Sequence, residues 1–195
     1  MNNKIAVFGC GFVGGTVADF LEQHDVEVTR VDPKLYPEND PVDAIVKADG
    51  IIICVPTPSK EDGSCDDKHI KEVLKLCNHK ERILLKSTVT PDLLQTYDDN
   101  VVYNPEFLRE RHAKSDFANQ PVQIFGYHMN NKEDAMWWAE IFAEIHTNPI
   151  ETVYTNRQTA SMIKYVHNAF LATKVAWFHE MYKTLPPEVN YEAMI

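Results

Sequence analysis

The sequence lacks several features that would assign it to a familiar class of protein. Its longest apolar runs fall far short of the roughly 20 residues that cross a bilayer. Positive charge is scarce, since 19 Lys and Arg stand against 29 Asp and Glu and give a net charge of −10. Nucleic acid and anionic membranes are therefore poor partners.

The spacing of the cysteines argues against a disulfide-rich protein and against a cysteine-bound metal site. The four cysteines show neither a C-x-x-C spacing nor a paired framework, so we expect no disulfide scaffold and no metal site. They are Cys10, Cys54, Cys65 and Cys77. The apolar "KIAVFGCGFVGG" near the start contains glycines and no cleavage-like site, which argues against a signal peptide. A reducing cytoplasm is the expected location.

What the sequence does contain is typical of a globular α/β protein. At 195 residues it has room for one domain and an appendage, and 44% of its residues are hydrophobic. Short apolar runs alternate with helix-like stretches, which predicts a doubly wound, mostly parallel sheet of the Rossmann type. Strands are expected at 4–8, 26–31, 50–55, 82–86, 101–103, 122–125 and 151–154. Helices are expected at about 12–23, 67–78, 91–97 and 131–146.

The last predicted element is one long helix at 155–185. It opens with a capping box, Thr155 with Gln158, and has no strong breaker for about thirty residues. We expect residues 1–154 to form a Rossmann domain and 155–195 to form a connecting helix and the start of a further region. The helix carries more apolar surface than one small domain covers, which predicts a homodimer. Its large apolar residues are Val166, Phe170, Trp177, Phe178 and Met181.

A glycine-rich turn, "GCGFVG", joins the first strand to the first helix. Gly9 permits a tight turn, Gly11 lets the backbone approach a pyrophosphate, and Gly14 lets the helix pack on the strand. Asp32 ends the second strand and can accept hydrogen bonds from ribose hydroxyls while repelling a 2′-phosphate. This arrangement predicts binding of NAD rather than NADP; the alternative is a turn used only for packing. Further candidate cofactor contacts are Phe12, Val13, Lys34, Val55, Pro56, Thr57 and Thr88.

Three other motifs follow strands at the same predicted edge of the sheet. "CVPTP" ends the third strand, and "KSTV" ends the fourth, where Thr88 could hold a water or a ribose hydroxyl, or cap the turn. "NPEFLRE" follows the fifth strand and places Glu106 where ligands of open α/β sheets gather. The alternative is that Glu106 and Glu110 complement a helix dipole.

The order of these motifs, followed by "KYVHNAFLATKVAWFHEM", resembles the nucleotide-sugar 6-dehydrogenases, typified by UDP-glucose and GDP-mannose 6-dehydrogenases. The resemblance covers essentially the whole chain. It implies oxidation of the C6 alcohol of a sugar nucleotide to a carboxylate with two NAD⁺, through a cysteine thioester. UDP-glucose is the substrate we expect first. The resemblance also implies a dimer formed through the long helix.

The resemblance also implies roles for individual residues. Glu106 would activate water for thioester hydrolysis, and Thr88 would help to place that water. Lys164 and Asn168 would stabilise the developing oxyanion; their i, i+4 spacing places both on one helix face, although Lys164 could instead extend to solvent. The residues expected to line the sugar side are Phe107, Leu108, Arg109 and Glu110.

Some positions depart from the family pattern. Arg111 stands where glycine is usual, Ser161 where a glutamate often precedes the lysine, and His179 where an asparagine is common. "PVQIFG" (121–126) lacks the arginine that commonly follows its proline. No segment matches the family's glycine-rich nucleophilic cysteine, and Cys65 in "EDGSCDD" is not its equivalent. We therefore expect a truncated relative, a fragment, or one chain of a split enzyme that a complementing chain completes.

Two other functions compete with a dehydrogenase half. One is a binding module that holds NAD or a partner chain without turnover. The other is a β-hydroxyacid dehydrogenase, whose helix also carries a Lys-x-x-x-Asn pair; "NPEFLRE" fits the sugar-nucleotide family better.

Overall fold

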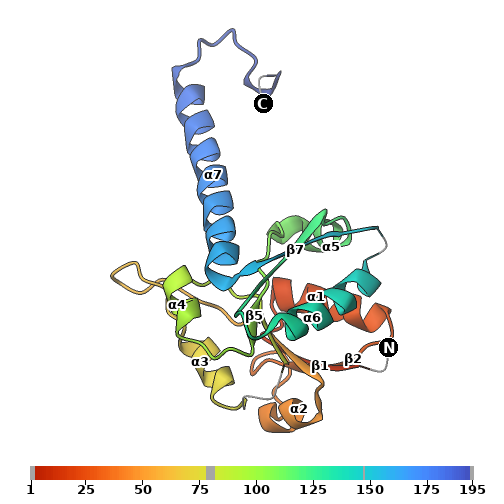
Figure 1. Ribbon diagram of the computed structural model, residues 1–195. Helices are drawn as coiled ribbons and strands as arrows, with labels where there is room; N and C mark the ends of the chain where they lie inside the picture. Colours follow the sequence, from red (N-terminus) through yellow and green to blue (C-terminus); the bar gives the residue numbers. More distant parts are fainter. Residues whose placement is uncertain (1–2, 78–81, 147, 194–195) are drawn as a thin grey trace.

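The computed structural model describes residues 3–77, 82–146 and 148–193 and contains a seven-stranded sheet with helices on both faces (Figure 1). The strands are β1 (Lys4–Phe8), β2 (Glu27–Val31), β3 (Gly50–Ile53), β4 (Arg82–Leu85), β5 (Val101–Tyr103), β6 (Val122–Tyr127) and β7 (Glu151–Asn156). The α-helices are α1 (Phe12–Gln23), α2 (Pro41–Lys47), α3 (Lys68–Leu74), α4 (Pro91–Gln95), α5 (Ala113–Ala118), α6 (Lys132–Ile145) and α7 (Arg157–Thr184). Two 3₁₀ turns are η1 (Glu110–His112) and η2 (Tyr191–Ala193).

The strand order is β2-β1-β3-β4-β5-β6-β7. Strands β1 to β5 run parallel, β6 is antiparallel to β5, and β7 is parallel to β6. The prediction of a mostly parallel Rossmann-type sheet is therefore confirmed. The chain order reverses between β1 and β3, and ligands of open α/β sheets bind outside the carboxyl ends of the strands at such a point.

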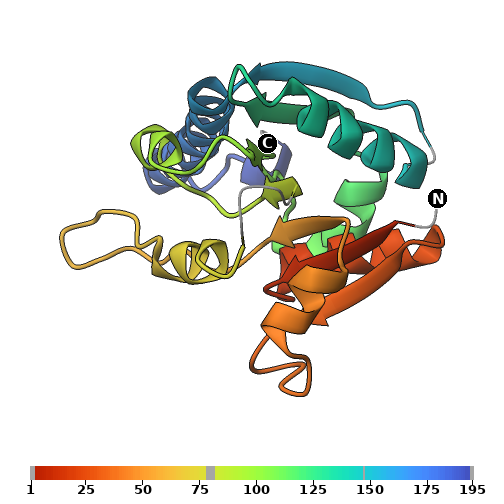
Figure 2. The same cartoon turned by 60° about the horizontal axis from the view of Figure 1, so that its bottom comes forward.

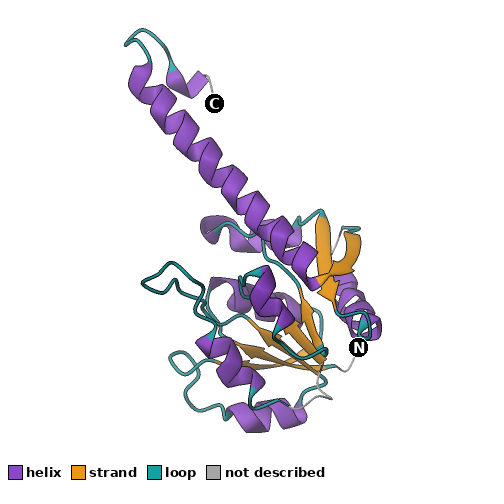
Figure 3. Ribbon diagram, turned by 60° about the vertical axis from the view of Figure 1, so that its left-hand side comes forward, coloured by secondary structure: helices purple, strands orange, loops and turns teal. Residues whose placement is uncertain are grey.

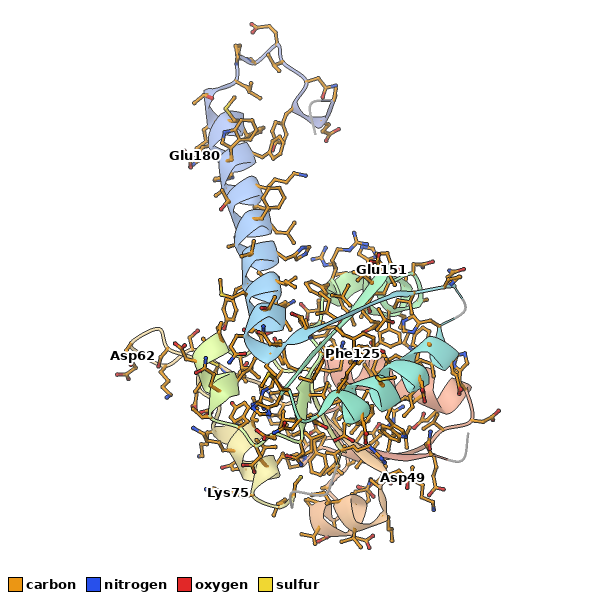
Figure 4. All side chains as sticks on the ribbon, in the orientation of Figure 1. Asp49, Asp62, Lys75, Phe125, Glu151 and Glu180 are labelled. Atoms are coloured by element: carbon orange, nitrogen blue, oxygen red, sulfur yellow. The ribbon has the colours of Figure 1, made fainter. Side chains whose placement is uncertain are left out.

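The apolar strands form because both faces of the sheet are covered. On one face, alternate strand residues such as Val7, Ile52 and Leu84 pack with side chains of α1, α5 and α6. On the other, Phe8, Ile53 and their neighbours pack with α2, α3 and α4. Figure 2 shows the two helical layers, and Phe125 is labelled in the packed interior in Figure 4. Strands buried on both faces explain the continuous apolar runs.

Several predicted boundaries differ from the structure. Helices α2 and α5 were not expected, and α3 is shorter than the predicted 67–78, of which residue 78 lies outside the described chain. The predicted capping box is wrong: Thr155 belongs to β7, and the N-cap of α7 is Asn156, whose side chain accepts a hydrogen bond from the Thr159 N–H at 2.8 Å. Thr90 is the N-cap of α4, but its side chain makes no capping bond.

Helix α7 is attached to the domain only by its first turns. Arg157 is buried and donates to the Asp98 carbonyl at 2.8 Å, and Ser161 Oγ donates to the Val89 carbonyl at 2.7 Å. Gly126 of β6 lets the helix approach, since a Cβ there would lie 2.7 Å from the Ala160 Cβ. Beyond these turns α7 projects away from the sheet (Figure 3). None of the helices within the described ranges is long and apolar enough to cross a membrane.

Candidate active site

The glycine-rich turn lies at the carboxyl end of β1, beside β3. Gly9 has a φ of +82°, and a Cβ there would lie 2.8 Å from the Cys54 carbonyl carbon, so both conformation and space require glycine. A Cβ on Gly14 would meet the Cys54 Cβ at 3.0 Å. The roles predicted for these two glycines in turn geometry and packing therefore agree with the structure.

Gly11 differs from the other two, because a Cβ there would meet no atom within 4 Å. This residue is the N-cap of α1 and makes no side-chain cap, so the first N–H groups of the helix face an exposed, open position. Phe12 is exposed beside it and Val13 is half-buried. An open glycine at a helix N-terminus fits the pyrophosphate of a dinucleotide.

Asp32 follows β2 and folds back onto the same turn. Its Oδ2 accepts from the Cys10 N–H at 2.9 Å, and its Oδ1 accepts from the Lys34 and Leu35 N–H groups at 2.9 and 3.3 Å. Partial burial alone would raise the pKa of Asp32, but these hydrogen bonds hold it below its ordinary value. A fixed carboxylate at the end of β2 fits the ribose of NAD, with Lys34 exposed two residues further on.

The loops after β3 and β4 are joined to each other. Thr57 Oγ1 donates to the Thr88 carbonyl at 2.7 Å, and Ser87 Oγ donates to the Val55 carbonyl at 2.7 Å. Pro56 lies exposed between them. An open pocket of about 560 Å³ adjoins these loops and is rich in hydroxyl groups. Its lining includes Thr57, Ser59, Ser64, Thr88, Thr90 and Tyr165.

Glu106 lies at the carboxyl end of β5 and is only 5% exposed. Its Oε1 accepts from the N–H groups of Phe107 and Leu108 at 2.8 and 3.2 Å. Its Oε2 lies 3.0 Å from the Lys86 ammonium, which the sequence analysis did not single out. The carboxylate is thus an interior group with a fixed orientation and a counter-ion, unlike a surface residue at a helix start. This geometry argues against the helix-dipole alternative.

Lys164 reaches the same place from α7. Its ammonium donates to the main-chain carbonyl of Glu106 and lies 5.1 Å from the centre of the Phe107 ring, which also meets His167 edge-on. Burial lowers the pKa of Lys164, while the nearby Glu106 carboxylate opposes that change. The lysine therefore points into the site, which rejects the alternative that it extends to solvent. Asn168 lies one turn further along α7 and is exposed.

The remaining "FLRE" residues turn away from this centre. Leu108 packs against the core, and Arg109 is exposed and pairs with Asp116 through two side-chain nitrogens at 3.0 and 2.7 Å. Glu110 is exposed at the start of η1. These residues lie next to Glu106 in the chain, but the side-chain contacts described for them do not reach its carboxylate.

All four cysteines are free thiols. Burial, with a smaller contribution from Asp32, raises the pKa of Cys10 to about 11. Burial also raises the pKa of Cys54 to about 12 and that of Cys65 above its ordinary value. Cys77 Sγ donates to the Val73 carbonyl at 3.4 Å. The three thiols with raised pKa values are poor sources of a thiolate at neutral pH.

Sequence reasoning missed the polar groups beneath Glu106. Lys86 closes an apolar strand and Asn104 directly follows one, and both are buried. The available signal was a charged residue and an amide directly after the buried apolar runs "ILL" and "VVY". Such groups need buried partners.

Comparison with known proteins agrees with this geometry. Residues 33–147, more than half of the chain, match the family model described as the UDP-glucose/GDP-mannose dehydrogenase family, NAD binding domain. A UDP-glucose 6-dehydrogenase from Rickettsia prowazekii is 31% identical over 91% of this chain and 51% of its own length. An uncharacterised protein from Methanocaldococcus jannaschii is 38% identical over 71% of this chain and 17% of its own length.

A solved structure shares the fold. In a ternary complex of GDP-mannose dehydrogenase from Pseudomonas aeruginosa, the matched region has a TM-score of 0.79 at 24% identity and covers 90% of this chain and 51% of that one. The chain thus spans about half the length, or less, of these relatives. By the match to the family model, the chain belongs to the UDP-glucose/GDP-mannose dehydrogenase family and carries its NAD-binding domain.

Proposed function

We propose that this chain is the NAD-binding half of a nucleotide-sugar 6-dehydrogenase that converts the C6 alcohol of UDP-glucose to a carboxylate. One observation carries the proposal: Glu106, which follows β5, and Lys164 from α7 meet at the carboxyl edge of the sheet, the same edge at which the dinucleotide turn follows β1. Bound NAD⁺ would accept the hydride, and the chain's own residues would hold and polarise the reacting groups.

The proposed roles follow from the chemistry of each group. Glu106 acts as the base that activates water, because its carboxylate is oriented by two backbone N–H groups. Lys164 and Asn168 donate to the developing oxyanion, and Thr88 places the water. Four residues of the loop after Glu106 form the wall on the sugar side. They are Phe107, Leu108, Arg109 and Glu110.

Cofactor binding divides among three loops. The turn of α1 supplies N–H groups to the pyrophosphate, Asp32 accepts from the adenosine ribose, and the loops after β3 and β4 flank the nicotinamide half. The residues assigned to these contacts are Gly9, Gly11, Phe12, Val13, Gly14, Asp32, Lys34, Val55, Pro56, Thr57 and Thr88. Because its cysteines are free thiols, we place the protein in the cytoplasm.

We further propose that residues 1–154 form the NAD-binding unit and that α7, with the residues after it, forms the connecting and dimerising region. The thioester route requires a thiolate beside C6. Cys10 and Cys54 have raised pKa values, and Cys65 and Cys77 lie in a loop and at a helix end. This chain alone would therefore hold NAD and the general base without supplying the nucleophile.

The test is to incubate the purified chain with NAD⁺ and UDP-glucose and to measure NADH and UDP-glucuronate. We expect no acid from the chain alone. Acid should appear when a chain carrying a family-type cysteine segment and sugar-binding domain is added, and Glu106→Gln should abolish it. NAD binding without acid under either condition would favour a binding module. Turnover of a small 3-hydroxy acid, but not of sugar nucleotides, would favour a β-hydroxyacid dehydrogenase.

A further inference from the structure

Lys86 is a lysine whose ammonium is fully withdrawn from solvent. It follows β4, near the middle of the sheet, and its N–H continues the ladder by donating to the Ile53 carbonyl at 2.9 Å. Its side chain is 0% exposed. A lysine side chain is long enough to reach water from many positions, so complete burial indicates that interior partners hold it.

Those partners form a connected network. The Lys86 ammonium donates to Asn104 Oδ1 at 2.5 Å and lies 5.3 Å from the centre of the Phe142 ring. Asn104 is itself fixed, because its Nδ2 donates to Gln123 Oε1 at 2.9 Å and to the Ile124 carbonyl at 2.8 Å. The amide of Asn104 thus has one orientation, and this orientation aims its oxygen at Lys86.

The remaining neighbour of the ammonium is Glu106. Oε2 lies 3.0 Å from Lys86 Nζ, and Glu106 is the one carboxylate within ion-pair distance of Lys86 in the described part of the chain. The contact lacks the alignment of a hydrogen bond, so Oε2 accepts none from the residues that the structure describes. Oε1, by contrast, already accepts two backbone N–H groups. Oε2 is therefore the oxygen with a free lone pair.

Other titratable groups around this pair do not replace Lys86. Lys164 donates to the main-chain carbonyl of Glu106 and not to its carboxylate. Cys54, which follows β3, and His146, the C-cap of α6, both interact with the charges of Lys86 and Glu106. Burial raises the pKa of Cys54 and lowers that of His146, so both favour their neutral forms.

We propose that Lys86 is a positioning residue that keeps the buried Glu106 carboxylate ionised and fixes its side-chain rotamer. A carboxylate removed from water neutralises unless a counter-ion accompanies it. A neutral Glu106 could not accept a proton from water, so the proposed base depends on Lys86. This inference deepens the proposed function and rests on it for its catalytic meaning, whereas the ion pair can be tested without any substrate.

The experiment observes the carboxyl carbon of Glu106 by NMR. The chain is labelled with carbon-13 in its glutamate carboxyl groups, and Glu106→Gln identifies the Glu106 resonance. In the native chain at neutral pH we expect that resonance at the position of an ionised carboxylate. In Lys86→Met it should shift to the position of a protonated acid. In Lys164→Met, which removes the neighbouring ammonium, it should remain at the ionised position.

A Glu106 resonance that stays ionised in Lys86→Met would overturn the proposal, as would an equal shift in Lys164→Met. If Lys86→Met does not fold, the ammonium resonance of Lys86 in nitrogen-15-lysine-labelled protein gives the second test. Glu106→Gln should shift that resonance, whereas Asp116→Asn should not; no shift in Glu106→Gln would also overturn the proposal. Neither measurement uses UDP-glucose, so the ion pair is tested even if the dehydrogenase assay fails.

Discussion

The Asp32 carboxylate stabilises the glycine-rich turn and, in our proposal, also binds NAD. In the structure its Oδ2 accepts from the Cys10 N–H and so holds the glycine-rich turn against the end of β2, while its Oδ1 accepts from the Lys34 and Leu35 N–H groups. In the proposed complex the same group accepts from the ribose of NAD. A substitution at this position therefore changes both the stability of the turn and the choice of cofactor.

We predict that Asp32→Ala weakens NAD binding about tenfold or more, since a hydrogen bond to a charged group is worth about 1.5–3 kcal/mol. Binding of NADP should change less, because the repulsion of the 2′-phosphate is lost as well. Calorimetric titration with both cofactors measures the difference between the affinities for NAD and NADP. Asp40→Ala is the matched control: it removes the side-chain cap of α2, costs about 1 kcal/mol of stability, and should leave the cofactor preference intact. Tighter binding of NADP than of NAD by the native chain would contradict the assignment.

His146 gives the protein a pH-dependent stability. Its ring lies 4.8 Å from that of Phe117, its Nδ1 pairs with the Phe142 carbonyl at 2.6 Å, and burial lowers its pKa below the ordinary value of 6.5. As the pH falls below about 6.5, the unfolded chain takes up a proton that the folded chain resists. The contribution of His146 to stability is therefore present above that pH and declines below it.

We predict that His146→Phe makes the free energy of unfolding less sensitive to pH from about pH 6.5 downward. Urea unfolding of both proteins at several pH values measures the slope. His69→Phe is the control, because His69 is exposed and pairs with Glu72 on the surface. Equal slopes for the native chain and His146→Phe would show that this histidine does not carry the effect.

At the scale of the elements, two glycines with different surroundings are expected to affect different properties, one the stability of the fold and the other the binding of NAD. A Cβ at Gly126 would lie 2.7 Å from the Ala160 Cβ and 2.9 Å from the Arg157 Cα, whereas a Cβ at Gly11 would meet nothing within 4 Å. We predict that Gly126→Ala destabilises the protein by about 1–3 kcal/mol, because α7 must shift from β6. Gly11→Ala should cost less than about 1 kcal/mol of stability, since alanine is a poorer N-cap for α1 than glycine, and should weaken NAD binding about tenfold or more.

Denaturation curves and NAD titrations of both variants test this pair of predictions. A loss of stability in Gly11→Ala as large as that in Gly126→Ala, or unchanged stability in Gly126→Ala, would contradict it. Each variant adds one methyl group to a glycine, at the N-cap of α1 in one case and within β6 in the other.

The elements also show how far sequence patterns extend. Buried strands and the helices α1 and α6 were predictable because their apolar runs reflect burial directly. The helices α2 and α5 are 7 and 6 residues long, too short for a clear period. The cap of α7 was misplaced by one residue because Thr155 and Asn156 are both good caps, and pairing of β7 with β6 through Asn156 decided between them.

The residues of the site also differ in whether a local sequence pattern predicts them. Glycines, Asp32 and Glu106 stand in local motifs whose chemistry can be read in order along the chain. Lys86 and Asn104 act through partners 18 to 20 residues away, on neighbouring strands. The order of the strands in the sheet decides which residues become neighbours, and a local sequence pattern does not contain that order.

Considered as one body, the protein exposes more surface than its mass requires. Its accessible surface is 11403 Å², whereas a compact monomer of 22.4 kDa exposes about 9,400 Å². Helix α7 projects from the domain, and Figure 4 shows its side chains standing free along its length, as far as Glu180. Val166, Phe170 and Trp177 are 56% to 66% exposed and lie on one helical face. A stable interface needs about 800 Å² from each partner, and α7 carries more of the exposed large apolar side chains than any other described element.

We therefore predict that the chain forms a homodimer through α7 at micromolar concentration. Phe170→Glu should produce monomers, because pairing two such helices would bury an unpaired carboxylate in the apolar face. Met129→Glu is the matched control: it replaces a residue that is 88% exposed in the turn between β6 and α6, and it should leave the dimer intact. Light scattering coupled to size exclusion measures the mass of each variant. A native chain that is monomeric would refute the dimer. If that monomer bound a complementing dehydrogenase chain and the Phe170→Glu variant did not, the same helical face would be the site where the two halves of a split enzyme join.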